Sequence, residues 1–142
     1  RVYMSEKSEF YTLTGYKLRN HYLLTEAMED YLEMIYRSGG ICCVKNLSIS
    51  LNVRPSSVSK MANKLKNLGY VSFKSYGDIF LTDNGKNVGE YLLWRHSILE
   101  ELLKYINKDD FCLEQVERIE HFVDNITLKN IENFLNKKEK KY

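Results

Sequence analysis

The sequence predicts a mostly α-helical fold with one small β-hairpin. A single proline and seven glycines among 142 residues favour long helices over a β-protein with many turns. Apolar residues recur every three or four positions along most of the chain after residue 24, which is the period of helices with one buried face. Between residues 70 and 82 this period gives way to two short strand-like runs around a glycine. With 44% hydrophobic residues, the chain can form one domain, or a small domain plus an assembly element.

The first helix is expected to begin at Thr25, whose hydroxyl can cap it. The apolar positions of this helix fall on one face: Met28, Tyr31, Leu32, Ile35 and Tyr36. Ser38-Gly39-Gly40 then ends it. Residues 1–22 show no helical period and are rich in tyrosine and charge. We expect an N-terminal arm there, either loosely ordered or packed against a partner surface.

The next segment predicts a helix, a turn and a second helix, followed at once by a hairpin. Asn52 can adopt the left-handed conformation that turns the chain, and Pro55 suits the first position of the following helix. Gly69 ends that helix, and Gly77 supplies the hairpin turn. The expected elements are helices at 44–51 and 55–68 and strands at 70–74 and 78–82. This order predicts an N-terminal winged helix-turn-helix over residues 23–83.

The charges of this segment indicate a polyanionic partner. The net charge of the chain is only +2, yet every charged residue between Val44 and Gly77 is a lysine or an arginine. The helix that starts at Pro55 has a basic and hydroxyl-bearing face, which predicts that it reads duplex DNA; a solvated basic helix pair is the alternative. The predicted DNA-contacting residues are Lys45, Arg54, Pro55, Ser56, Ser57, Ser59, Lys60, Lys64, Lys74 and Tyr76.

The second half is predicted to be helical throughout, over residues 84–142. Thr82 can cap a long helix that runs to about Ile106. This helix is apolar on more than one side, so a second subunit is its expected second cover. A further helix is expected from about Asp109 to Val123, and a last one from Thr127, followed by a charged tail. The half is therefore predicted to be an α-helical dimerisation domain.

Two sequence features bear on the location of the protein. No apolar run approaches the roughly 18 residues of a membrane span, and no secretory segment is evident. The cysteines Cys42, Cys43 and Cys112 are odd in number, and their spacing fits neither a zinc site nor a disulfide framework. We therefore expect reduced cysteines in a cytoplasmic protein.

Carboxylate and histidine side chains in three of the predicted helices form a candidate metal site. Each cluster alone is more often a solvated acidic patch or a packed histidine. Together they offer oxygen and nitrogen ligands without sulfur, which suits manganese or ferrous iron. Four carboxylates can hold two ions if some of them bridge. The predicted ligands are Asp30 and Glu33 on the first helix, His96 on the long helix, and Glu117, Glu120 and His121, which a continuous helix would place on one side.

Five motifs follow one another along the chain: Met28-Glu29-Asp30-Tyr31-Leu32-Glu33, Arg54-Pro55-Ser56-Ser57-Val58-Ser59-Lys60-Met61, Leu81-Thr82 with Gly85-Lys86, Arg95-His96, and Glu117-Arg118-Ile119-Glu120-His121. With these motifs the chain resembles the diphtheria-toxin-repressor-type, metal-dependent transcriptional regulators, and specifically their manganese-responsive branch. The resemblance extends from about Leu24 to Leu135.

This resemblance implies a repressor that binds palindromic operator DNA as a metal-activated homodimer and controls metal uptake genes. It also implies two Mn²⁺ ions per subunit, with Glu117 and Glu120 bridging them and His121 on the second ion. The iron-responsive branch has methionine at the position of Asp30 and cysteine at that of Glu117. Carboxylates at both positions therefore favour manganese.

Three other interpretations remain open at this point. The chain can be an iron-responsive regulator of the same family, or a winged-helix regulator that metal does not control. A metalloenzyme is the third, because a two-metal site can activate water. No separate general base or substrate pocket is recognisable in the sequence, so we expect that the protein is not an enzyme.

Overall fold

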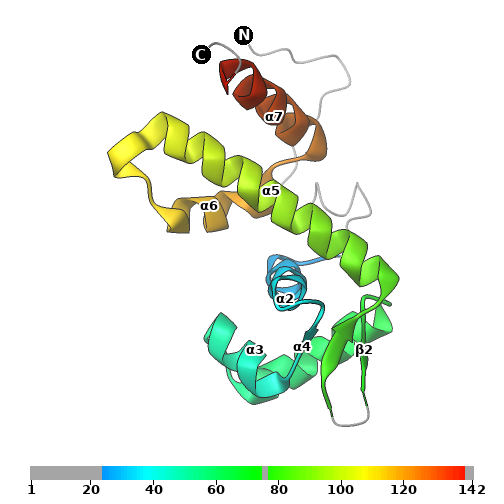
Figure 1. Ribbon diagram of the computed structural model, residues 1–142. Coiled ribbons are helices and arrows are strands. Elements are labelled where there is room, and N and C mark those ends of the chain that lie inside the picture. Colours follow the sequence, from blue (N-terminus) through cyan, green and yellow to red (C-terminus); the bar gives the residue numbers. More distant parts are fainter. Residues whose placement is uncertain (1–23, 75–76, 140–142) are drawn as a thin grey trace, which may run out of the picture.

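The computed structural model describes residues 24–74 and 77–139 (Figure 1). The predicted N-terminal arm and Tyr76 lie outside the described residues. The elements are α2 (Glu26–Arg37), β1 (Ile41–Cys42), α3 (Val44–Leu51), α4 (Pro55–Asn67), β2 (Val71–Phe73), β3 (Ile79–Leu81), α5 (Asp83–Asn107), η1 (Lys108–Asp110), α6 (Leu113–Ile119), η2 (Glu120–Phe122) and α7 (Asn125–Glu139). The predicted fold class, mostly α-helical with a small β element, is confirmed.

Local sequence signals set the helix boundaries in the first half. The hydroxyl of Thr25 accepts a hydrogen bond from the backbone N–H of Met28 at 3.2 Å and caps α2. Asn52 has φ 54° and ends α3 in the left-handed conformation. Pro55 occupies the first turn of α4, where its missing N–H leaves no hydrogen bond unmade. Asn52 and Pro55 thus define the turn between α3 and α4.

The hairpin belongs to a three-stranded antiparallel sheet with the order β1-β3-β2. The predicted pairing of β2 with β3 is confirmed, with Ser72 opposite Phe80. The edge strand β1 was not predicted; in it Ile41 pairs with Phe80 on the other side of β3. A two-residue strand is too short to show alternation, so its pairing is decided by tertiary contacts. The wing, made of β2, β3 and the turn between them, is therefore joined to β1 in one sheet.

Buried residues from α2, α3, α4, the sheet and α5 form the first core. The helical period predicts that Val58, Met61, Leu65 and Leu68 face inward, and two of these four are not fully buried. Leu68 is 38% exposed, because it follows the last turn of the helix, and Met61 is only half-buried. Ala62 is buried instead, and its small side chain allows α4 to approach the core closely. The fully buried members of this core are Leu32, Ile35, Leu47, Val58, Leu65, Val71, Ile79 and Leu92.

Helix α5 crosses the molecule and contributes to both halves (Figure 1). The hydroxyl of Thr82 caps it by accepting a hydrogen bond from the backbone N–H of Gly85. Gly89 lies where α5 meets α2, and a Cβ atom added there would be 2.6 Å from the Cβ atom of Tyr36. Only glycine permits this approach. The first turns of α5 are therefore fixed against α2.

The predicted fifth helix, Asp109 to Val123, is wrong in its extent. Lys108 has φ 52° and ends α5, and a 3₁₀ turn and two extended residues then precede α6. Helix α6 covers only Leu113–Ile119, and Glu120 and His121 lie in the following 3₁₀ turn η2. Only Val116 of α6 is fully buried. A helix held by a single buried side chain can end early. The hydrophobic period of the sequence does not show where it ends.

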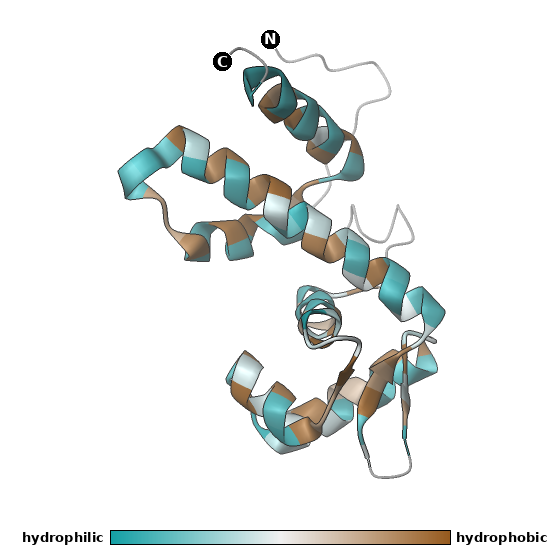
Figure 2. Cartoon of the chain, viewed as in Figure 1, coloured by the Kyte–Doolittle hydropathy of each residue, from teal (hydrophilic) through white to brown (hydrophobic). Residues whose placement is uncertain are grey.

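The second core joins α5, α6 and α7 around Leu99, Val116 and Leu128. Trp94 of α5 donates its indole N–H to the carboxylate of Glu132 on α7 at 2.8 Å, which ties these two helices together. Figure 2 shows apolar segments along α5 and α7 in brown. Several large apolar side chains of this half are exposed: Tyr105, Ile106, Leu113, Phe122, Ile126 and Phe134. Within the described residues, no helix is both long and apolar enough to cross a membrane.

Candidate metal centre

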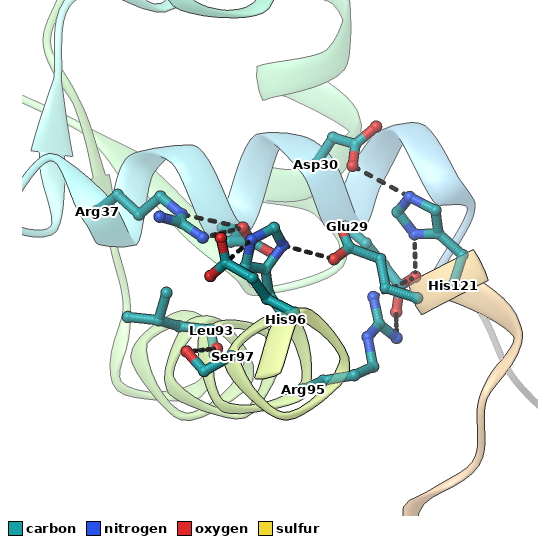
Figure 3. A network of polar contacts seen from close by, with 11 residues as sticks. Glu29, Asp30, Arg37, Leu93, Arg95, His96, Ser97 and His121 are labelled. Atoms are coloured by element: carbon teal, nitrogen blue, oxygen red, sulfur yellow. Dashed lines mark hydrogen bonds and ion pairs between the residues drawn. The ribbon is translucent and has the colours of Figure 1, made fainter. Parts of the chain in front are cut away.

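Three elements that are distant in the sequence, α2, α5 and η2, meet at one place. Asp30 and Glu33 project from α2, His96 from α5, and Glu120 and His121 from η2. Figure 3 shows His96 where α2 meets α5, and Asp30 next to His121. The turn η2 thereby brings the second half of the chain into contact with a helix of the winged half. Five of the six predicted ligands are close to one another in this way.

These five side chains form two groups that share one carboxylate. Asp30, Glu120 and His121 form the first group, and Glu33, His96 and Glu120 form the second. Within each group, one possible ligand atom per residue lies within 4.8 Å of the others. Glu120 is only 3% exposed and belongs to both. This spacing suits divalent cations bound by carboxylate oxygen and imidazole nitrogen.

The sixth predicted ligand, Glu117, lies apart from both groups. It is exposed on α6, and it is not in either of the clusters found among the described residues. The sequence argument placed Glu117, Glu120 and His121 on one face of a continuous helix, but that helix ends at Ile119. The change to a 3₁₀ turn redirects Glu120 and His121 away from the direction of Glu117. Its role as a ligand stays a prediction.

The hydrogen bonds in the cluster show how strongly its carboxylates attract positive charge. The Nδ1 atom of His96 lies 2.7 Å from Oε2 of Glu120, and this bond is the largest of the effects that raise the pKa of His96. The Nε2 atom of His121 lies 3.2 Å from Oδ1 of Asp30. Burial lowers the pKa of His121, but hydrogen bonds to Asp30 and Glu29 outweigh it and raise the value to about 9. Both imidazoles thus favour the protonated form.

The pKa of Glu33 also reflects the high density of carboxylates in the cluster. Burial raises its pKa, the nearby charge of Glu120 raises it further, and Arg37 opposes both effects. The guanidinium group of Arg37 donates to Oε2 of Glu33 at 2.9 Å. Repulsion between two partly buried carboxylates is the condition that a bound cation relieves.

A buried ion pair lies directly behind the cluster, and the sequence analysis did not single it out as a site. Glu29 of α2 is 1% exposed and Arg95 of α5 is 3% exposed. Both side chains occupy positions on the apolar stripes of their helices: Glu29 lies one turn before Leu32, and Arg95 lies between Leu92 and Leu99. A charged residue at a core position is the sequence signal that identifies such a pair.

The donor set agrees with a hard divalent cation. Both groups contain only carboxylates and imidazoles, which are the ligands that manganese and ferrous iron accept. The thiols Cys42, Cys43 and Cys112 belong to neither group. These two groups therefore contain no sulfur ligand for a soft metal ion.

The predicted DNA-contacting side chains that the structure describes are all exposed. They lie on α3 and α4, at the residue before α4 and at the residue after β2: Lys45, Arg54, Pro55, Ser56, Ser57, Ser59, Lys60, Lys64 and Lys74. Lys74 lies over the ring of Phe80 at 5.6 Å, which holds a positive charge at the base of the wing. Lys66, which was not among the predicted contacts, lies in the same way over Phe73 at 5.0 Å.

The fold and the cluster together define a class: a DNA-binding regulator with a winged helix-turn-helix and a helical half that responds to metal. Two family models match the chain. The iron dependent repressor N-terminal DNA binding domain matches residues 23–79, and the iron dependent repressor metal binding and dimerisation domain matches residues 82–141. The chain belongs to this family. The predicted resemblance to diphtheria-toxin-repressor-type regulators is confirmed.

Individual relatives agree with the family. The chain is 39% identical over 116 residues to the HTH-type transcriptional regulator MntR of Oceanobacillus iheyensis, covering 79% of each chain. It is 40% identical over 103 residues to MntR of Shouchella clausii, covering 70% of this chain and 72% of that protein. These relatives are transcriptional regulators, so the prediction that the protein is not an enzyme is confirmed.

Solved structures show the same fold. The manganese regulator SloR matches with a TM-score of 0.66 and 25% identity over 77% of this chain, and this chain covers 53% of that one. The hypothetical protein SSo2273 from Sulfolobus solfataricus matches with a TM-score of 0.62 and 26% identity, covering 80% and 91% of the two chains. The family's DNA-binding and dimerisation domains identify operator DNA and a second copy of the chain as its partners.

Proposed function

We propose that the protein is a manganese-dependent transcriptional repressor, which binds palindromic operator DNA as a metal-activated homodimer and controls metal uptake genes. The observation that carries this proposal is the pair of carboxylate–imidazole groups that share Glu120. The relatives named MntR and the manganese regulator SloR support manganese as the metal. As a regulator of transcription, the protein is proposed to act in the cytoplasm.

We assign two cations to each subunit. Asp30, Glu120 and His121 are proposed for one of them, and Glu33, His96 and Glu120 for the other. Glu117 is proposed as a further bridging ligand, on the strength of the family resemblance. A bound cation supplies positive charge that offsets the crowded carboxylates. We propose that the chain divides near residue 83 into a DNA-binding domain and a metal-binding, dimerising domain, and these ligands then come from both.

The ligands would act by fixing η2 against the α2–α5 junction. In the absence of a cation, the carboxylates of Glu33 and Glu120 repel each other. Once their charge is offset, the two carboxylates can be held together, and the dimerising half is fixed relative to the winged half. The two α4 helices of a dimer must be about one DNA turn apart to enter successive major grooves. Metal and DNA would therefore strengthen each other's binding, typically by ~1–3 kcal/mol.

A DNA-shift assay tests the proposal. A palindromic operator is first selected from a random duplex pool, and its retardation is compared with Mn²⁺, Fe²⁺, Zn²⁺ or a chelator. We expect the strongest retardation with Mn²⁺, and loss of it in Asp30→Ala and Glu120→Ala. The control is Glu114→Gln, which removes an exposed carboxylate of α6. Equal operator binding with Mn²⁺ and with the chelator would exclude metal control.

Iron control within the same family is the second candidate, because ferrous iron accepts the same ligands. The same assay under anaerobic conditions separates the two metals. Calorimetric titration then counts the ions: two Mn²⁺ per chain supports the assignment of both groups, and a single Mn²⁺ contradicts it.

A further inference from the structure

We propose that Glu29, held in place by Arg95, is a positioning residue for His121. It would fix the orientation and tautomer of the imidazole so that Nε2 faces the cation. This inference rests on the proposed function of the site, and it adds a residue that binds no cation itself.

The ion pair between Glu29 and Arg95 is built to hold one carboxylate in one place. The NH1 nitrogen of Arg95 donates to Oε2 of Glu29 and the NH2 nitrogen to Oε1, each at 3.2 Å. Two parallel bonds fix the plane of the carboxylate as well as its position. Both side chains are almost fully buried, and they come from helices that Gly89 brings into close contact. Glu29 is therefore part of a rigid platform made by α2 and α5.

His121 contacts this platform through only one of its ring nitrogens. Its Nδ1 atom lies 2.8 Å from Oε1 of Glu29. An ionised carboxylate only accepts hydrogen bonds, so Nδ1 carries a proton and donates it. Nε2 lies 3.2 Å from Oδ1 of Asp30 in the first ligand group, and in the protonated ring it donates to that carboxylate. Once this second proton is lost, Nε2 is the nitrogen that offers a lone pair to a cation. Figure 3 shows His121 between Glu29 and Asp30.

This arrangement gives Glu29 a role that differs from those of Asp30 and Glu120. Both of its oxygens accept hydrogen bonds from Arg95, and one also accepts the bond from His121. It is absent from both ligand groups. Such partners of ligating histidines commonly change metal affinity by ~10–100-fold when they are removed. The whole effect of Glu29 on metal affinity should pass through His121.

A double-mutant cycle tests this dependence. Mn²⁺ affinity is measured by calorimetry in the full chain, in Glu29→Gln, in His121→Ala and in the double variant. We expect Glu29→Gln to weaken the binding ~10–100-fold in the parent and to leave it unchanged when His121 is already alanine. An equal loss in both backgrounds would show a general charge effect and overturn the proposal, as would no loss in the parent. Glu90→Gln, an exposed carboxylate of α5, is the matched control.

A spectroscopic signature separates positioning from a structural role. In protein loaded with Co²⁺, the Nδ1 proton of His121 should give a shifted proton resonance that exchanges slowly with water. Its absence in His121→Ala assigns it. We expect Glu29→Gln to broaden it or remove it by faster exchange. A resonance that persists unchanged in Glu29→Gln would contradict the proposal.

Folding and the proposed function are checked separately. If Glu29→Gln melts before the assay temperature, Glu29→Asp replaces it in the cycle, because it keeps the charge opposite Arg95 but shortens the reach to His121. Failure of the unchanged protein to bind Mn²⁺ would overturn both the proposed function and this inference. If the unchanged protein binds Mn²⁺ and a Glu29 variant binds it with the same affinity, only the inference about Glu29 is overturned.

Discussion

At the residue scale, His121 lies between two carboxylates and has its pKa raised from 6.5 to about 9. Its protonated form is therefore favoured in the folded, metal-free protein. The resulting stability is fully present below about pH 6.5, the ordinary value of the unfolded chain. It is lost as the pH rises through about 9.

We therefore expect the melting temperature of the metal-free protein to fall between about pH 6.5 and pH 9. Thermal melts followed by circular dichroism across this range measure the slope. In His121→Gln the part of the slope due to this residue should vanish. The same slope in both proteins would show that His121 does not carry the effect.

The carboxylate of Glu120 is shared by both ligand groups, whereas Asp30 belongs to one. We predict that Glu120→Gln weakens the binding of both Mn²⁺ ions by at least about tenfold, while Asp30→Asn leaves one of them bound. Calorimetric stoichiometry separates these results. Two ions retained in Glu120→Gln with parental affinity would contradict the shared role.

At the scale of elements, the contact between α2 and α5 depends on Gly89. An alanine there would place its Cβ 2.6 Å from the Cβ of Tyr36, and that atom cannot move without its backbone. We predict that Gly89→Ala lowers the free energy of unfolding by ~1–3 kcal/mol, measured by urea denaturation. Asn87→Ala, exposed on the same helix, should change it by less than about 0.5 kcal/mol. Similar values for both variants would exclude the close contact as the cause.

The sequence was sufficient to predict most elements and most of the candidate site. Caps at Thr25 and Thr82, the turn at Asn52 and Pro55 in the first turn of α4 are local signals, and the structure agrees with each of them. The edge strand β1 and the early end of α6 were missed. Both depend on contacts between distant segments, which no local pattern records.

The site illustrates the same limit. Residue type and the family resemblance identify the ligand candidates, but they do not identify Glu29, because the hydrophobic period of α2 is defined by its apolar members alone. Its partner Arg95 is 66 positions away. The sequence alone places both residues on the apolar stripes of their helices. It does not show that they pair, because the pairing depends on how α2 packs against α5.

At the scale of the whole molecule, the basic surface of α3, α4 and the wing lies far from α7 (Figure 1). Binding that is dominated by phosphate contacts should weaken steeply with salt. We predict that Lys60→Ala reduces the slope of log K against log salt by about 1, measured by fluorescence anisotropy with labelled operator. Lys129→Ala on α7 should leave the slope unchanged. A salt-independent affinity would contradict a phosphate-dominated interface.

Helix α5 is one continuous helix of 25 residues, so it is about 37 Å long. Tilting such a rod by ~5° about one end displaces the other by ~3 Å, close to the rise of one base pair, ~3.4 Å. In a symmetric dimer each subunit adds its own displacement. A small change in the angle of α5 is thus enough to move the two α4 helices relative to each other by at least about one base-pair step.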